Sequence, residues 1–176
     1  GVVSGHSSFC CCTPFVLLAL PCAAPIRDDG FSPIAPHLRC ASVTGTEAKW
    51  TAILAERIQG ADVVVTSSAL FRIDYAAYAA LPWSGLILDE AQFVKNHQSK
   101  TYQCARRLSV PFKLAITGTP LENSLMDLWS MLSIVAPGLF PSPQRFSELY
   151  LKPIEAGGAP ELLATLRRRI RPLMRR

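Results

Sequence analysis

The sequence has no C-x-x-C pair, although it contains six cysteines. Cys10 to Cys12 are adjacent, and the other three, Cys22, Cys40 and Cys104, are scattered along the chain. This spacing excludes the common zinc-binding patterns and does not form the regular framework of a disulfide-rich secreted domain. We therefore expect a reduced, intracellular setting.

Lysine and arginine are absent before Arg27, which bears on the apolar run "PFVLLALPCAAP" near the start. A secretory signal has a similar apolar core, but it needs a positively charged segment in front of that core. The run is also too short to span a membrane. We expect neither a signal peptide nor a membrane partner. The chain starts with Gly1 and not with Met, which predicts that it is a fragment of a longer protein.

Charged residues are few, at 18% of 176 residues, while hydrophobic residues make up 49%. These proportions predict one globular domain with a proper core and exclude a largely disordered chain. The net charge of +5 gathers at the end, where the last ten residues hold six arginines, Arg167, Arg168, Arg169, Arg171, Arg175 and Arg176. Such an end suits an anionic partner such as nucleic acid. A solvated helix face with a basic tail explains it equally well.

Strand-like and helix-like stretches alternate from about Ser42 onward. Short apolar, often β-branched runs predict buried strands at 61–67, 84–90 and 112–120. Apolar residues at helical spacing predict helices at 44–60, 70–81, 99–109 and 123–135. Continuous apolar strands separated by helices predict an α/β fold, with a parallel sheet covered by helices on both faces.

The two ends of the chain differ from this middle. Residues 1–37 are rich in proline and poorly legible, with one strand-like run, "FVLLAL". One hypothesis is that this segment is degraded or read out of frame, which sequencing the encoding DNA and its upstream flank would test. We expect residues 38–140 to form the main part of the lobe and 141–176 a helical, basic C-terminal part.

Three predicted strands end in polar clusters, namely Thr66-Ser67, Asp89-Glu90 and residues 117–119. In a parallel sheet, ligands bind beyond the carboxyl ends of the strands. A carboxylate there can hold Mg²⁺ beside the phosphates of a nucleotide, and its neighbour can polarise the attacking water. This assigns Mg²⁺ to Asp89 and the general base to Glu90. An exposed loop that merely begins with acids is the alternative explanation.

Four segments of the sequence occur in an order and spacing that can be compared with known families. "ADVVVTSSALFRID" is followed by "DEAQFVKN", some twenty residues later by "LAITGTPLENSLMDLWSMLSIVAPGLF", and at the end by "LRRRIRPLMRR". In this order and spacing they resemble the helicase-like ATPases of the Swi/Snf type, in helicase superfamily two. "DEAQ" is similar to their Walker B box and "TGTP" to their motif III. The resemblance covers Leu38 to Arg176.

The resemblance implies a RecA-like lobe of the P-loop NTPase type, incomplete here, with a helical C-terminal extension. Proteins of this family bind ATP and Mg²⁺ between two such lobes and move along duplex DNA. By the resemblance, Asp89 coordinates Mg²⁺ and Glu90 activates water. Gln92 links the nucleotide site to motif III.

The same resemblance places Thr117, Gly118 and Thr119 in the coupling motif, with Gly118 allowing a close backbone approach. Thr66 and Ser67 fall where the family contacts the DNA backbone, since hydroxyls and backbone amides suit phosphate. A simple cap at the end of the strand explains these two residues equally well.

The phosphate-binding half of such a site is missing from the sequence. No G-x-x-x-x-G-K-[ST] string occurs, nor any Gly-Lys dipeptide, and the second lobe would follow Arg176. We therefore expect the parent protein to be an ATP hydrolase and this chain alone to be inactive. The alternative is a non-catalytic fragment that binds nucleic acid or protein.

The resemblance also sets the expected partners and location. Duplex DNA is the expected partner, together with further proteins, and the sequence sets no oligomeric state. The expected location is the cytoplasm or nucleoid of a bacterium, or the nucleus of a eukaryote.

Overall fold

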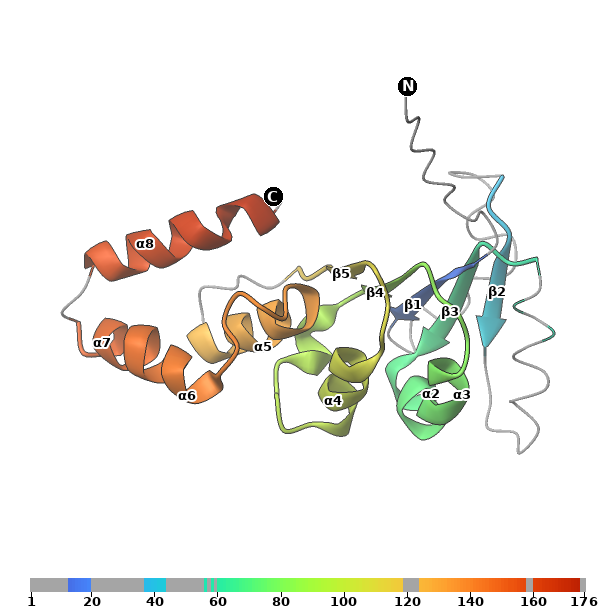
Figure 1. Ribbon diagram of the computed structural model, residues 1–176, viewed down its shortest axis with the longest axis horizontal. Helices are drawn as coiled ribbons and strands as arrows, with labels where there is room; N and C mark the ends of the chain where they lie inside the picture. The colour runs from blue at the N-terminus through green and yellow to red at the C-terminus, as the bar shows by residue number, and fades with distance from the viewer. Residues whose placement is uncertain are drawn as a thin grey trace, which may run out of the picture.

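The computed structural model describes residues 13–19, 37–43, 56, 58, 60–118, 124–157 and 160–174. Its centre is a five-stranded sheet with the order β2-β3-β1-β4-β5 (Figure 1). All four strand pairings are parallel, which confirms the predicted sheet type. The strands are β1 (Phe15–Ala19), β2 (Cys40–Val43), β3 (Val63–Ser67), β4 (Gly85–Leu88) and β5 (Lys113–Ala115).

The earliest strand occupies the middle of the sheet. β1 pairs with β3 on one side, where Phe15 lies beside Val63, and with β4 on the other, where Phe15 lies beside Gly85. The strand-like run in the first segment is therefore a strand. At least this part of residues 1–37 shares a sheet with the predicted main part. The sequence does not predict β2, because its four residues are mostly half-buried and lack an apolar run.

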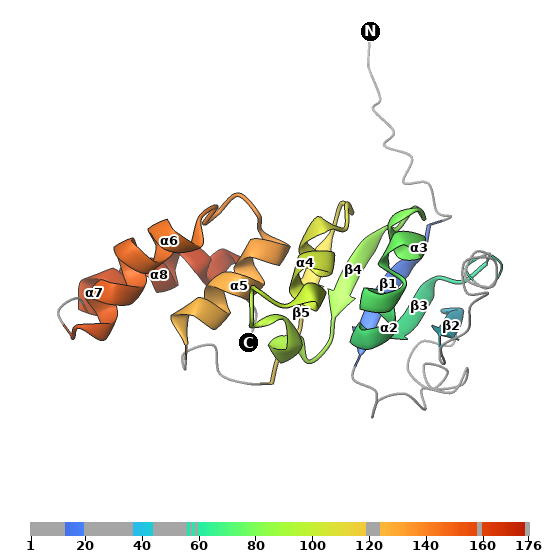
Figure 2. The same ribbon diagram turned by 90° about the horizontal axis from the view of Figure 1, so that it is seen from below.

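One face of the sheet is buried under helices. Val16, Leu18, Val64, Leu86 and Leu88 are all 0% exposed on this face. The helices beneath them are α2 (Ser68–Ile73), α3 (Tyr75–Ala79) and α4 (Lys100–Arg107), and Figures 1 and 2 show them gathered on the same side. This face forms the core of the α/β part.

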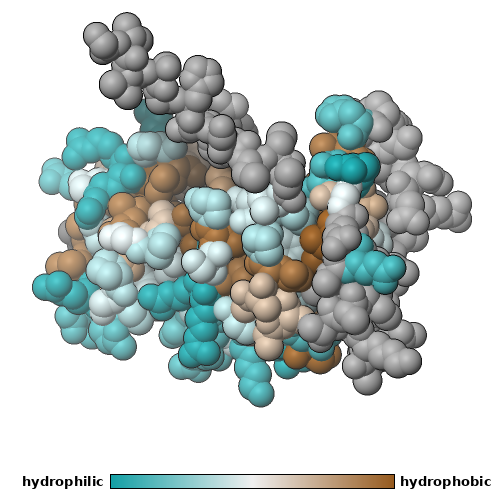
Figure 3. All heavy atoms as spheres, turned by 45° about the vertical axis from the view of Figure 1, so that its right-hand side comes forward, coloured by the Kyte–Doolittle hydropathy of each residue, from teal (hydrophilic) through white to brown (hydrophobic). Residues whose placement is uncertain are grey.

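The opposite face is also apolar but is less covered. Phe112, Leu114 and Ile116 alternate with Lys113 and Ala115 along the edge strand and are 49%, 41% and 48% exposed. Among the described residues, no helix lies over β1, β3 and β4 on this side (Figures 1 and 2). Figure 3 shows apolar side chains reaching the surface between polar ones. The predicted helical cover is thus found on one face of the described part.

The helix predicted at 70–81 is divided at Asp74. Asp74 has φ −103° and ψ 27°, outside the helical region, and ends α2 while preceding α3. Its N–H donates to the carbonyl of Leu70, and its own carbonyl accepts from Ala77 at 2.9 Å. Aspartate competes with helical hydrogen bonding and favours helix ends, so the break falls at this residue. The predicted helix at 44–60 lies largely outside the described residues.

Helices dominate the C-terminal third, as predicted. α5 (Leu125–Val135) is followed by α6 (Pro143–Phe146), the π-helical η4 (Ser147–Leu151), α7 (Lys152–Glu155), α8 (Pro160–Ile170) and the 3₁₀ turn η5 (Arg171–Leu173). The π turn ends two residues before Pro153, which has no N–H and whose ring crowds the carbonyl four residues earlier, within the π turn. A widened turn is one way for a helix to pass such a proline.

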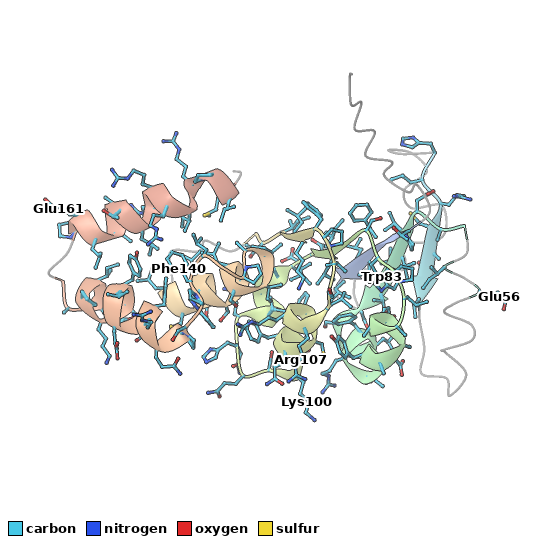
Figure 4. The ribbon with its side chains drawn as sticks, in the orientation of Figure 1. Glu56, Trp83, Lys100, Arg107, Phe140 and Glu161 are labelled. Atoms are coloured by element: carbon cyan, nitrogen blue, oxygen red, sulfur yellow. The ribbon has the colours of Figure 1, made fainter. Side chains whose placement is uncertain are left out.

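α8 packs through one face onto an aromatic cluster. Leu166 and Ile170 are buried, as the helical spacing predicts, while Arg167 to Arg169 are largely exposed. Arg169 is nevertheless engaged, because it donates to Tyr150 Oη at 2.8 Å and lies over the ring of Phe140. Figure 4 shows Phe140 among these helices. The described helices include none that is long and apolar enough to cross a membrane.

Candidate functional site

The polar residues singled out in the sequence lie along the carboxyl edge of the sheet. Leu18 of β1 is beside Leu88 of β4, which is beside Ala115 of β5. Asp89 N–H donates to the carbonyl of Leu18 at 2.9 Å, which continues the ladder past the end of β4. Asp89 therefore lies at the end of an inner strand with β1 on one side and β5 on the other.

Glu90 has an unusual backbone conformation. Its φ of 52° and ψ of 53° place it in the left-handed region, and it is the one non-glycine residue with positive φ in the described part of the chain. Such a conformation costs an L-amino acid about 1–2 kcal/mol. Glu90 N–H donates to Asp89 Oδ1 at 3.1 Å. Strained residues gather at functional sites, so this turn directly after β4 is a functional candidate.

Gln92 holds the carboxylate of Glu90. It lies in the 3₁₀ turn η2 (Ala91–Val94), and its Nε2 donates to Glu90 Oε2 at 2.7 Å. Its Oε1 is buried and has no hydrogen-bond partner among the described residues. A buried acceptor without a donor is costly, so this oxygen is a position where a further group would be stabilised.

The acidic pair fits Mg²⁺ by its chemistry. Asp89 Oδ2 and Glu90 Oε1 make no hydrogen bond within the described ranges, and both side chains are half-buried. Mg²⁺ is commonly held by one or two carboxylates together with water and phosphate oxygens. No group of three or more acidic, histidine or cysteine side chains that could hold a metal occurs among the described residues. The pair thus suits a shared site better than a closed protein cage.

Thr66 and Ser67 lie at the same edge, but β1 separates them from the acidic pair. With neighbouring strands about 4.8 Å apart, they are roughly 10 Å from Asp89. Thr66 is 3% exposed, and its Oγ1 accepts from Tyr78 Oη at 2.9 Å. Ser67 caps α2, since its Oγ accepts from the N–H of Leu70 at 3.2 Å.

Both hydroxyl oxygens therefore accept a hydrogen bond from inside the fold, and DNA contact at these two residues stays a prediction. Burial also raises the pKa of Tyr78 to about 12, although its hydrogen bond with Thr66 acts in the opposite direction. Tyr78 stacks on Trp83, whose Nε1 donates to the carbonyl of Tyr78 at 2.7 Å. Figure 4 shows Trp83 beside the sheet. Local sequence patterns do not predict this buried network.

The coupling motif lies beside the acidic pair. Ala91 N–H donates to the carbonyl of Ile116 at 2.8 Å, which joins the turn after Glu90 to the segment that leads into Thr117. Thr117 is half-buried, and Thr119 lies outside the described residues. A side chain added at Gly118 would meet no atom within 4 Å. The close backbone approach that Gly118 would allow stays a prediction.

Lys95 and Asp127 form a contact that sequence reasoning missed. Lys95 Nζ lies 3.5 Å from Asp127 Oδ2, so the residue that ends η2 is paired with the first turn of α5. The spacing of acidic and basic residues along a chain does not reveal such a long-range pair. The only local signal is Ser124, which caps α5 through the N–H of Asp127 and so marks the start of that helix.

Comparison with known proteins shows which family the chain resembles. A family model described as the SNF2-related domain matches residues 31–176. Zorya protein ZorD of Escherichia coli is 38% identical over 114 residues, which are 64% of this chain and 11% of that protein. TATA-binding protein-associated factor MOT1 of Saccharomyces cerevisiae is 29% identical over 143 residues, which are 81% of this chain and 8% of that protein.

A solved structure resembles the whole described fold. The Sulfolobus solfataricus SWI2/SNF2 ATPase core in complex with dsDNA matches with a TM-score of 0.79 and 29% identity, over 94% of this chain and 34% of that chain. The chain thus spans about a tenth of the two relatives' length and about a third of the ATPase core. The resemblance to Swi/Snf-type ATPases and the RecA-like sheet predicted from the sequence are confirmed. The chain belongs to the SNF2-related domain family.

Proposed function

We propose that the chain forms part of the ATP-binding lobe of a DNA-dependent ATPase, a helicase-like translocase that couples ATP hydrolysis to movement on duplex DNA. One observation carries the proposal, namely the acidic pair at the carboxyl end of β4, where Glu90 is in the left-handed conformation and its carboxylate is bound by Gln92. Membership of the family and the likeness to an ATPase core solved with dsDNA support it.

The acidic pair divides the chemistry of hydrolysis. Asp89 would hold Mg²⁺, which neutralises charge on the phosphate oxygens when it is bound. Glu90 would orient the attacking water and accept its proton, since Gln92 leaves Glu90 Oε1 available among the described residues. The bond from Gln92 keeps the carboxylate from rotating freely. We propose Gln92 as the link between this carboxylate and the coupling motif.

The coupling motif would lie next to the phosphates of the same bound nucleotide. Thr117, Gly118 and Thr119 follow β5, next to the turn that carries the acids. The open space at Gly118 leaves room for a ligand to approach the backbone, as the absence of a side chain permits. We propose that an occupied nucleotide site closes on this motif, and that the buried Oε1 of Gln92 then gains a donor.

Hydrolysis needs groups that this sequence does not contain. Without a phosphate-binding loop, the charge of the phosphates lacks its usual stabilisation. We expect DNA-stimulated ATP hydrolysis by the full-length gene product that contains this chain, and none by the purified chain. Glu90→Gln should abolish the activity of the full-length protein while leaving its melting temperature unchanged. Robust turnover by the purified chain, lost on Glu90→Gln, would contradict the second expectation.

DNA contact at Thr66 and Ser67 stays a prediction, and Ser67 offers a matched pair of variants to test it. Ser67→Asp keeps an N-cap on α2 but adds a negative charge, which would repel a phosphate. Ser67→Ala removes the cap and should cost about 1 kcal/mol of stability. If DNA passes this edge, Ser67→Asp weakens DNA binding more than Ser67→Ala does. Equal affinities for the two variants would place the DNA elsewhere.

A non-catalytic nucleic-acid or protein-binding role is the second candidate, favoured by the missing phosphate-binding string. A salt-dependent DNA titration of the chain with and without ATP and Mg²⁺ separates the two. Binding that ignores the nucleotide favours the binding module. In either case, we propose that the protein acts in the compartment that holds the DNA, with further proteins as partners.

A further inference from the structure

The ion pair of Lys95 and Asp127 connects the turn after the acidic pair to the helix after the coupling motif. Its two side chains are 24% and 32% exposed, so both are partly withdrawn from solvent. Exposed ion pairs contribute little, whereas partly buried ones are screened less by salt. The pair joins segments 32 positions apart, so it constrains two elements that local backbone geometry does not relate.

The same turn is fastened at its other end. Ala91 N–H donates to the carbonyl of Ile116, so η2 is attached to the β5 side at its start and to α5 at its end. Ala91 and Val94 are both 0% exposed, so these two side chains of the turn pack in the core. Gln92, which binds the carboxylate of Glu90, lies between these two attachments. Both attachments are therefore placed to influence the orientation of that carboxylate.

α5 is a firm reference for the second attachment. Seven of its residues are buried, and Trp129 Nε1 donates to the carbonyl of Phe140 at 2.9 Å. His97, two residues after Lys95, meets the ring of Trp129 edge to face with centroids 5.6 Å apart. The chain from Lys95 to His97 therefore lies along α5, with Lys95 paired to the first turn of that helix and His97 packed on Trp129.

We propose that Lys95 and Asp127 are positioning residues, whose ion pair sets the place of the Glu90–Gln92 turn relative to α5. Movement of the first turn of α5 is thereby transmitted to the carboxylate of Glu90. The role in hydrolysis rests on the function proposed above, whereas the mechanical link rests on the contacts alone. The tests are therefore separate.

Hydrogen–deuterium exchange on the chain tests the link. Lys95→Met and Asp127→Asn should each speed the exchange of the amides of Ala91 to Val94 by about three- to tenfold. The double variant should exchange no faster than the single variants, because the pair is lost only once. Lys95→Arg should keep slow exchange. Unchanged exchange in both single variants, or additive effects in the double variant, would overturn the link.

Arg39→Met provides the matched control. Arg39 and Asp62 also form an ion pair, at 3.2 Å, but on the far side of the sheet from α5. Its loss should leave the exchange of Ala91 to Val94 as in the wild type. Faster exchange in this control would mean that the turn responds to general destabilisation, and would also overturn the link.

ATP hydrolysis by the full-length gene product tests the consequence. Both single variants should lower kcat by about three- to tenfold with little change in the KM for ATP, because they misplace the base and remove no ATP contact. The conservative variant Lys95→Arg should keep a kcat close to that of the wild type. An unchanged kcat would overturn the positioning role even if exchange changes. A wild type without hydrolysis would contradict the proposed function, and the exchange experiment would still decide on the link.

Discussion

Both faces of the sheet are apolar, but the side chains along the edge strand β5 are much more exposed on one face than the side chains at the centre of the other face. On the helix-covered face, Leu18 and Leu86 are completely buried, whereas on the other face Leu114 and Ile116 are nearly half exposed. Parallel strands that are covered on both sides carry near-continuous apolar runs. The apolar sequence of these strands therefore predicts burial on both faces. The exposed fractions show that, within the described residues, one face is only partly covered along β5.

The edge strand β5 shows the contrast within three residues. Lys113 is on the helix-covered side, next to Leu86, while Leu114 points to the open side. Lys113 Nζ is accommodated because it donates to the carbonyls of Ala105 and Arg106 at the end of α4, at 2.8 and 2.9 Å. A charged residue thus lies inward because a helix end accepts its hydrogens.

The largest expected effect comes from removing side-chain volume on the two faces. Leu86→Ala should lower the free energy of unfolding by about 2–5 kcal/mol, because it leaves a cavity in the core. Ile116→Ala should cost less than about 1 kcal/mol, since this side chain is 48% exposed. Urea denaturation measures both. Equal losses would show that the two faces are equally well packed in solution.

A smaller effect is expected from adding a methyl group where β4 begins. A side chain at Gly85 would lie 2.7 Å from the ring of Phe15 and 3.0 Å from the carbonyl of Phe112. Gly85→Ala should therefore cost about 1–3 kcal/mol. Gly118→Ala, where the added group meets nothing within 4 Å, is the matched control and should keep near-normal stability. Thermal melting of the two variants measures the difference in stability. Similar losses of stability would show that the added methyl group is accommodated equally well at both positions.

The pH dependence of stability should reveal Lys113. Burial, with a smaller contribution from Arg106, lowers the pKa of Lys113 from 10.5 to about 8. Between these values the unfolded chain still holds a proton that the folded protein has released, so stability rises with pH in this window. The gain is at most about 1.4 kcal/mol per pH unit.

Lys113→Met isolates this contribution. Denaturation at several values between pH 7.5 and 10 should show the wild type gaining stability relative to the variant as the pH rises. Parallel curves would mean that the two carbonyls keep Nζ protonated in the folded protein.

The smallest effect concerns Glu90, which belongs to neither face. Glu90→Gly and Glu90→Ala both remove the carboxylate, but glycine adopts the left-handed conformation without strain. The glycine variant should be more stable than the alanine variant by about 0.5–1 kcal/mol. Chemical denaturation of the two proteins side by side measures this. A more stable alanine variant would show that the turn readily leaves its left-handed conformation.

Much of the fold follows from local patterns in the sequence. The runs that become β3, β4 and β5 are recognisable because buried parallel strands are short and apolar. The caps Ser99 and Ser124 mark the starts of α4 and α5. The acidic pair was placed correctly at the end of β4 because the strand and its polar end are both local features.

The misses arise where distant contacts decide. The hydrogen bond that Thr66 accepts from Tyr78 of α3 cannot be predicted from the neighbours of Thr66 in the sequence. Lys95 and Asp127 are 32 positions apart, so their ion pair cannot be predicted from local sequence. β2 has too short an apolar pattern to be recognised from the sequence. It is a strand because it pairs with its neighbour β3. The break at Asp74 was missed because the apolar spacing continues through it.

The central position of β1 also has a kinetic consequence. Its partner residues are far away in the chain, since Phe15 pairs with Val63, 48 positions later, and with Gly85, 70 positions later. Closing such loops precedes any gain from pairing, which slows folding. During synthesis β1 leaves the ribosome before β3 and β4 and cannot pair with them until they emerge. This strand is therefore the segment most exposed to wrong pairing, and the point at which a chaperone would have the greatest effect on the yield of folded protein.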